Sequence, residues 1–188
     1  MDKTEIPYWE GLRNEIRYRA DHPRKDAVLC SSGEVTHSYL DLKAHFTHRG
    51  ALTRLGEAML IYRRLLGVRY PTAVGGPTMG ADFISFAMAM SDDVEWFSVR
   101  ETPKDHGLQK LIEGAELDES DRVILVDDVV SSGASLMRAF DTVWDAGAEI
   151  VAVMPLVDRA GIAETSFLER GVRYHPLFTH HELGIEPL

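Results

Sequence analysis

Residues 123–137 read VILVDDVVSSGASLM, and this stretch decides the predicted fold. Its first four residues are all apolar, as in a short strand that is buried on both faces of a sheet. The chain then changes abruptly to Asp127 and Asp128, two carboxylates that are costly to bury without partners. The small and hydroxyl-bearing residues 131–135 follow, which lets backbone N–H groups approach an oxyanion at a helix start. The stretch therefore predicts a buried strand that opens into a phosphate-binding loop.

A simpler interpretation of the same stretch is an ordinary connection between a strand and a helix. In that case Ser131 or Ser132 caps the helix, and the two aspartates lie in water. Two familiar nucleotide-binding motifs are excluded. The stretch lacks the Gly-Lys-Ser/Thr ending of a P-loop, and it lacks the G-x-G-x-x-G pattern of dinucleotide-binding proteins.

The rest of the chain alternates between predicted strands and predicted helices. Helical spacing of apolar residues predicts helices at 5–20, 50–66, 80–90, 134–146 and 162–169, and strands are expected at 72–76, 95–99, 122–126, 149–156 and 172–177. Two short strands around a tight bend are expected within residues 26–42. Repeated β-α-β order implies a parallel sheet with helices on both faces. Ligands of such sheets bind beyond the carboxyl ends of the strands, which points to the loops 75–80, 100–114 and 127–135.

Composition narrows the class of protein. The chain has 188 residues, of which 45% are hydrophobic and 27% are charged, as in a soluble globular protein with one domain. The formal net charge of -10 disfavours nucleic acid as a partner, although local cations can still bind a small anion. No apolar stretch is long enough for a membrane span, and the start lacks a signal-peptide core, so a cytoplasmic location is expected. The single cysteine, Cys30, excludes an internal disulfide.

The stretch 123–137 resembles the signature of type I phosphoribosyltransferases, which bind phosphoribosyl pyrophosphate. The resemblance implies an α/β fold with a central, mostly parallel sheet flanked by helices and a small N-terminal hood element. Residues 1–188 would form one domain, with the helix and hood at about 1–45 and the core at about 46–180.

Asp127 and Asp128 would be catalytic and face the ribose hydroxyls. Mg²⁺ would lie near them, held mainly by the substrate, with no protein ligand directly assigned. The implied substrate-binding residues of this stretch are Asp127, Asp128, Val129, Val130, Ser131, Ser132, Gly133, Ala134 and Ser135.

Residues 99–114, VRETPKDHGLQKLIEG, make the resemblance more specific. On composition alone they form a solvated surface loop. They are similar, however, to the mobile catalytic loop of orotate phosphoribosyltransferases, which reaches pyrophosphate partly across a dimer interface. This implies that Arg100, Lys104 and His106 bind substrate, and that Lys104 and His106 are also catalytic.

Further matches to this family run in order over about residues 26–180. The segments 31–33 and 39–43 resemble the part of the family near the orotate ring, and 75–80 resembles its G-P-x-x-G turn. Residues 156–159 resemble its V-D-R motif, which implies that Arg159 binds the orotate carboxylate. Without the resemblance, an arginine in this position is more often a surface residue that closes a strand. The resemblance implies a homodimer.

Three positions depart from the family's pattern and leave two alternatives open. Glu101 stands where the family has a second cation, Val35 stands where Lys or Arg is frequent, and Met79 replaces a residue that is lysine in some members. The expected function is that of an orotate phosphoribosyltransferase, which forms orotidine 5-monophosphate and pyrophosphate in pyrimidine nucleotide biosynthesis. The alternatives are a similar enzyme for another base and a non-catalytic regulator that binds phosphoribosyl pyrophosphate.

Overall fold

The computed structural model describes residues 3–21, 28–29, 35–36, 40–102 and 110–187. Their main feature is a five-stranded sheet with the strand order β5-β4-β3-β6-β8. Four strands run parallel: β3 (Ala73–Pro77), β4 (Glu95–Val99), β6 (Arg122–Leu125) and β8 (Glu149–Val153). The edge strand β5 (Ile112–Gly114) pairs antiparallel with β4. The predicted, mostly parallel sheet is therefore confirmed, and β5 lies in what was expected to be a loop.

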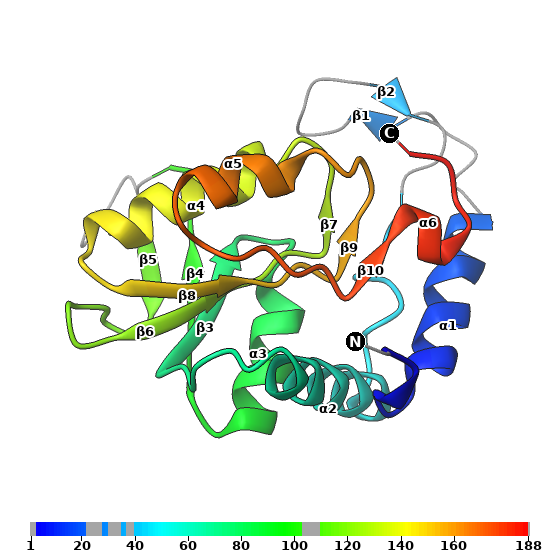
Figure 1. The fold of residues 1–188 in the computed structure, drawn as a ribbon, viewed down its shortest axis with the longest axis horizontal. Helices are drawn as coiled ribbons and strands as arrows, with labels where there is room; N and C mark the ends of the chain where they lie inside the picture. The colour runs from blue at the N-terminus through cyan, green and yellow to red at the C-terminus, as the bar shows by residue number, and fades with distance from the viewer. Residues whose placement is uncertain (1–2, 22–27, 30–34, 37–39, 103–109, 188) are drawn as a thin grey trace.

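Helices cover both faces of this sheet (Figure 1). The helices α2 (Arg49–Leu65) and α3 (Asp82–Asp92) lie on one face, while α4 (Ala134–Asp145) and α5 (Ala163–Glu169) lie on the other. Side chains along β6 alternate between these two layers, as the strand geometry requires. Ile124 packs with the α2 and α3 side, whereas Val123 and Leu125 pack with the α4 and α5 side. Burial on both faces explains the unbroken apolar run that the sequence showed.

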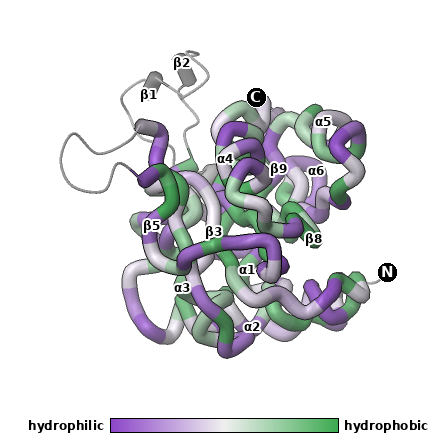
Figure 2. The backbone as a smooth tube through the Cα atoms, turned by 90° about the vertical axis from the view of Figure 1, so that its left-hand side faces the viewer, coloured by the Kyte–Doolittle hydropathy of each residue, from purple (hydrophilic) through white to green (hydrophobic). Residues whose placement is uncertain are grey.

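The helices are amphipathic, as their periodicity predicted. Figure 2 shows hydrophobic and hydrophilic residues alternating along α2. The residues of α2 that become buried recur at helical spacing and include Leu55, Met59 and Tyr62. The helix α3 buries Ile84 and Met88 in the same cluster. In the part of the chain that the structure describes, no helix has the length and apolar character that crossing a membrane requires.

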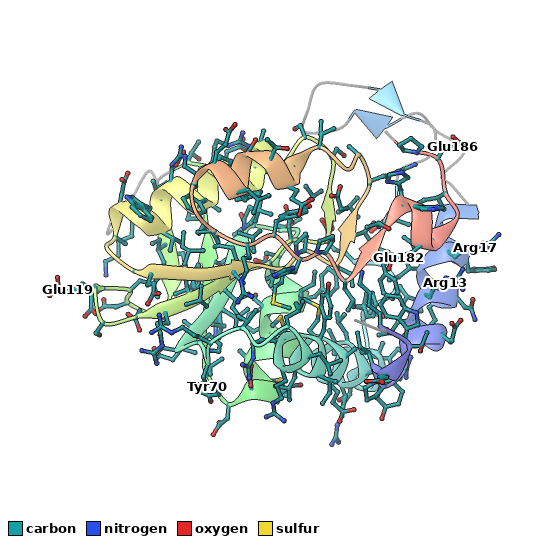
Figure 3. All side chains as sticks on the ribbon, viewed as in Figure 1. Arg13, Arg17, Tyr70, Glu119, Glu182 and Glu186 are labelled. Atoms are coloured by element: carbon teal, nitrogen blue, oxygen red, sulfur yellow. The ribbon has the colours of Figure 1, made fainter. Side chains whose placement is uncertain are left out.

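The N-terminal part packs against the C-terminal end of the chain. A short 3-10 helix, η1 (Lys3–Glu5), precedes α1 (Trp9–Asp21), and the ring of Trp9 stacks on Phe178 with centroids 4.2 Å apart. Arg13 donates from Nε to the backbone oxygen of Glu182 in α6 (His180–Leu183) at 2.7 Å, and the two residues lie side by side in Figure 3. Beyond α1, β1 (Val28–Leu29) and β2 (Val35–Thr36) form the expected antiparallel pair.

A second, three-stranded parallel sheet lies beyond the carboxyl ends of β6 and β8. It has the order β10-β9-β7, with β7 (Val129–Val130), β9 (Val157–Asp158) and β10 (Phe178–Thr179). The sequence did not predict this sheet. The strand expected at 172–177 was wrong, because that segment makes only one isolated bridge, between Tyr174 and Val153, and the paired strand β10 begins at Phe178.

Candidate active site

Asp127 and Asp128 lie at the junction of the two sheets, between β6 and β7. Their backbone is fixed by the neighbouring connection between β8 and β9. The N–H of Leu156 donates to the oxygen of Asp127 at 2.8 Å, and the N–H of Val157 donates to the oxygen of Asp128 at 3.0 Å. Because these bonds continue the pairing of β6 with β8, the two carboxylates are held rigidly beyond the carboxyl edge of the main sheet.

Both aspartates are buried, and most of their close partners are backbone groups. Oδ1 of Asp127 accepts from the N–H of Asp128 at 2.9 Å, and Oδ1 of Asp128 accepts from the N–H of Val129 at 2.7 Å. Oδ2 of Asp128 accepts from Nζ of Lys43 at 2.8 Å. Lys43 follows the segment 39–42, so a residue of the N-terminal part completes the site. Two adjacent buried carboxylates thus face one lysine.

The electrostatics of this pair favour binding of a further positive charge or a hydroxyl donor. Burial raises the pKa of Asp127 well above its ordinary value, and the charge of Asp128 raises it further, while Lys43 opposes both effects. A ligand that donates hydrogen bonds, or a cation, would relieve the cost of ionising Asp127.

The same carboxylates fit the predicted Mg²⁺. This ion binds through one or two carboxylates together with substrate phosphates, rather than through a cage made only of protein groups. Within the described residues, no three acidic, histidine or cysteine side chains form a metal-binding cluster.

Glycine is required where the loop after β3 passes the two carboxylates. A Cβ atom on Gly80 would lie less than 3.0 Å from Oδ1 of both Asp127 and Asp128. Gly76 has a similar constraint, because a Cβ there would meet the backbone oxygen of Val126 and the Cβ of Ala81. The glycines of the segment 75–80 thus allow β3 and its loop to approach the acidic pair closely.

The small residues after β7 form a turn into α4. Gly133 has φ of 79°, in the left-handed region that favours glycine, and α4 begins at the next residue. Oγ of Ser132 accepts from the N–H of Ala134 at 3.4 Å, but the N-cap is Gly133 and no side chain caps α4. The interpretation in which a serine caps the helix and the aspartates lie in water is therefore wrong, because both aspartates are also buried. The first N–H groups of a helix have no acceptor within the helix and carry partial positive charge. This end of α4 is suited to a phosphate group.

These elements surround one cleft with a volume of about 480 Å³. The predicted substrate-binding residues that line it are Arg100, Asp127, Asp128, Val129, Val130, Ser131, Ser132, Gly133, Ala134 and Ser135. Residues that sequence reasoning did not assign also line it, among them Lys43 and Arg138. A signal for Arg138 was present, because it lies three residues after Ser135 and therefore on the same face of α4.

The loop between β4 and β5 returns to this cleft at both ends. Val99 is the register partner of Ile112, and the N–H of Arg100 donates to the oxygen of Leu111 at 2.8 Å. Val99, Arg100 and Leu111 all line the cleft. The predicted catalytic residues Lys104 and His106 belong to this loop but lie outside the described residues.

Arg159 takes a different position from the other predicted residues. It is buried, directly after β9, and its backbone N–H donates to the oxygen of Val130 at 2.8 Å. The preceding Asp158 accepts from the N–H of Gly161 at 2.8 Å, which shapes the turn. Arg159 is not among the described residues that line the cleft, so its contact with a base remains a prediction.

Comparison with known proteins identifies relatives over most of the chain. No family model matches the sequence. The orotate phosphoribosyltransferase of Pyrococcus abyssi is 35% identical over 149 residues, which cover 79% of this chain and 81% of that protein. The enzyme of the same name from Mycobacterium leprae is 36% identical over 160 residues, covering 84% and 87%. A crystal structure of Mycobacterium tuberculosis orotate phosphoribosyltransferase in complex with phosphoribosyl pyrophosphate superimposes with a TM-score of 0.74 at 30% identity, covering 95% of this chain and 100% of that one.

Proposed function

Because the chain belongs to the orotate phosphoribosyltransferase family, we propose that it transfers ribose 5-phosphate from phosphoribosyl pyrophosphate to orotate. The products are orotidine 5-monophosphate and pyrophosphate, in pyrimidine nucleotide biosynthesis. One observation carries the assignment: the buried pair Asp127 and Asp128 shares a cleft with the serine-rich start of α4. This places groups suited to ribose hydroxyls next to groups suited to a phosphate.

The reaction forms a bond between a ring nitrogen of orotate and the anomeric carbon, and breaks the bond from that carbon to pyrophosphate. The electron pair of the broken bond leaves with pyrophosphate, so positive charge develops on the sugar and negative charge on the leaving group. The carboxylates of Asp127 and Asp128 stabilise the ribose side. Arg100, which lines the cleft, stabilises the departing oxygens together with Lys104 and His106. Orotate is already an anion, so the site needs no strong general base.

Mg²⁺ is the proposed cofactor, located beside Asp127 and Asp128. When bound with substrate, the ion neutralises negative charge on the diphosphate. The raised pKa of Asp127 supports this position, because Lys43 is the one cation among the described residues that lowers it, against burial and the charge of Asp128. Arg159 is proposed to bind the orotate carboxylate.

Turnover of orotate tests the proposal directly. Purified protein with phosphoribosyl pyrophosphate, Mg²⁺ and orotate should deplete the absorbance of orotate. Asp128→Asn should reduce turnover by about a hundredfold or more, since it removes a charge next to the reacting sugar. Asp93→Asn is a matched control with the same chemical change. Asp93 is exposed and has φ of 56°, a conformation that asparagine also tolerates, so its variant should keep wild-type turnover.

The two alternative functions predict different results in this assay. A regulator would bind phosphoribosyl pyrophosphate without depleting orotate or any other base. An enzyme for another base would turn over that base and leave orotate untouched. Val35, which motivated the second alternative, belongs to β2, and the structure describes its backbone alone. Met79 is exposed and does not line the cleft. Glu101 does line the cleft, and its carboxylate lies 3.4 Å from the guanidinium of Arg138.

A homodimer is the proposed assembly, with the loop around Lys104 shared across the interface. Exposed apolar side chains on α3 and β4 support it. Phe86 and Met90 lie one turn apart on α3, and the ring of Phe86 lies 4.5 Å from that of Trp96 on β4. Neighbouring exposed apolar residues of this kind often mark an interface. Sedimentation equilibrium should give a dimer for the wild type, and Met90→Glu should shift the mass towards the monomer.

Residues 1–188 are proposed to form one domain. The two apolar clusters share the strands of the central sheet, since Val74 belongs to one and the adjacent Ala73 to the other. A single unfolding transition seen with both fluorescence and circular dichroism would agree with this proposal. The cytoplasmic location and the exclusion of nucleic acid as a partner stay predictions from composition.

A further inference from the structure

Arg138 connects the phosphate-binding loop to the strand end that bears Glu101. Its guanidinium donates from Nη2 to Oγ of Ser135 at 3.0 Å and lies 3.4 Å from Oε1 of Glu101. All three residues line the cleft. Arg138 lies on the first turns of α4, so its charge is added to the N–H groups at the start of that helix. A cation therefore lies at the point where the loop 131–135 meets the cleft.

The pair of Arg138 and Glu101 is poorly shielded from solvent and is therefore weak. The side chain of Arg138 is 55% exposed and that of Glu101 is 78% exposed. Ion pairs at this exposure contribute little to stability, because water screens them. A guanidinium has five N–H donors in a planar fork, so Arg138 can keep its bond to Ser135 while it donates to another anion. A phosphate dianion carries more charge than a carboxylate and therefore attracts the arginine more strongly.

We propose that Arg138 binds the 5-phosphate of phosphoribosyl pyrophosphate and that Glu101 occupies this arginine in the free protein, to be displaced when the phosphate binds. The assignment rests on the proposed function and adds a cation to its substrate site. The pairing with Arg138 neutralises the charge of Glu101 in the free protein, whereas an unpaired carboxylate at this position would repel the substrate. The shared contact with Ser135 selects the 5-phosphate over pyrophosphate, because Ser135 belongs to the loop at the start of α4.

Binding measurements on three anions test this assignment. Titration calorimetry with phosphoribosyl pyrophosphate, ribose 5-phosphate and inorganic pyrophosphate would be carried out in the presence of Mg²⁺. Arg138→Gln should weaken the affinity for phosphoribosyl pyrophosphate and for ribose 5-phosphate by roughly ten- to hundredfold, the range for a lost hydrogen bond to a charged group. The affinity for pyrophosphate should change by less than about twofold. Arg138→Lys should recover part of the affinity, because lysine restores the charge without the planar fork. In turnover, Arg138→Gln should raise the KM for phosphoribosyl pyrophosphate and change kcat little, since the phosphate is remote from the reacting carbon.

Glu101→Gln tests the displacement. It should strengthen binding of ribose 5-phosphate by about two- to fivefold, the range for a weak competing pair. In the double variant with Arg138→Gln, this gain should vanish, because the glutamate then has no arginine to occupy. Arg69→Gln and Glu149→Gln are matched controls. These two residues form an exposed ion pair that does not border the cleft, and both variants should bind all three anions as the wild type does.

Three results would overturn the assignment. Unchanged affinity of Arg138→Gln for ribose 5-phosphate, in a protein whose wild type binds phosphoribosyl pyrophosphate, would refute the role of Arg138 and leave the proposed function standing. A gain from Glu101→Gln that persists without Arg138 would show that Glu101 repels the substrate directly. Failure of the wild type to bind phosphoribosyl pyrophosphate at all would refute the proposed function, and the role of Arg138 with it.

Discussion

Lys43→Met should destabilise the protein in a way that depends on pH. The substitution keeps most of the length and apolar stem of the side chain and removes its charge. Nζ of Lys43 lies 2.8 Å from Oδ2 of Asp128, and the side chains are 35% and 12% exposed. Without Lys43, the two adjacent carboxylates lose the cation that the structure places against them.

The geometry sets the size of the effect. Two unit charges at the 2.8 Å separation attract by about 6 kcal/mol at an effective dielectric near 20. Solvent reaches the lysine, and the free lysine is well hydrated, so most of this attraction does not appear as stability. An exposed pair contributes about 0–1 kcal/mol, and breaking a fully buried pair costs about 3–5 kcal/mol. The intermediate burial of this pair gives an expected loss of about 2 kcal/mol near pH 8.

Urea unfolding at several pH values measures this loss. Lys43 lowers the pKa of Asp127 against the larger effects of burial and Asp128, so Lys43→Met should raise that pKa further above its ordinary value of 3.8. A carboxyl with a raised pKa in the folded state binds its proton more tightly there than in the unfolded chain. The deficit of the variant should therefore be complete above the folded pKa of Asp127 and shrink as the pH falls through it.

The control is Lys110→Met, which breaks an exposed pair with Glu116 and should leave the urea midpoint almost unchanged at any pH. The reasoning would be refuted by a Lys43→Met deficit that stays constant over the whole pH range in which the protein is folded, or that grows towards acid. A constant deficit would mean that Lys43 stabilises the fold through contacts that do not depend on the charge of Asp127.

Three further predictions concern the turn at the carboxylates, the core and the loop outside the described residues. Gly80→Ala should reduce kcat by at least about tenfold, because the added Cβ would meet the carboxylates of Asp127 and Asp128. The control Gly11→Ala adds a Cβ with no atom within 4 Å and should keep the wild-type kcat. Equal kcat values for the two variants would refute the constraint at Gly80. Arg63→Met should cost about 3–5 kcal/mol in urea unfolding, since it leaves buried Asp92 without the arginine that donates to both its oxygens; a loss below about 1 kcal/mol would contradict this. Lys104→Ala should cut turnover of orotate by about a hundredfold, and near-wild-type activity would remove Lys104 from the site.

The sequence predicted the central sheet well because its signals are local. Apolar runs and helical periodicity depend on neighbouring residues, so the strand at 122–126 and the helix at 134–146 were found to within one residue. The second sheet could not be found in this way. Its strands β7, β9 and β10 have two residues each, too few to show any period. They form because the connections after β6 and β8 lie side by side and bond to each other.

The same distinction applies to the site. The acidic pair and the small residues after it are consecutive, so one motif revealed them together. Lys43 reaches Asp128 across 85 positions of sequence, and Arg138 reaches Glu101 across 37. Such pairs depend on how the elements pack, and no spacing rule predicts them. Glu101 and the position of Arg138 on the face of Ser135 were both visible in the sequence, but their pairing became visible only in the structure.

The antiparallel pairing of β4 with β5 has a consequence for substitutions in the loop that connects the two strands. Because Val99 and Ile112 are register partners, the sheet fixes the two ends of the loop and is independent of what lies between them. Substitutions between these anchors would therefore leave the pairing of β4 with β5 unchanged. Under the proposed function, this separates the residues that would face the leaving group from those that hold the sheet together.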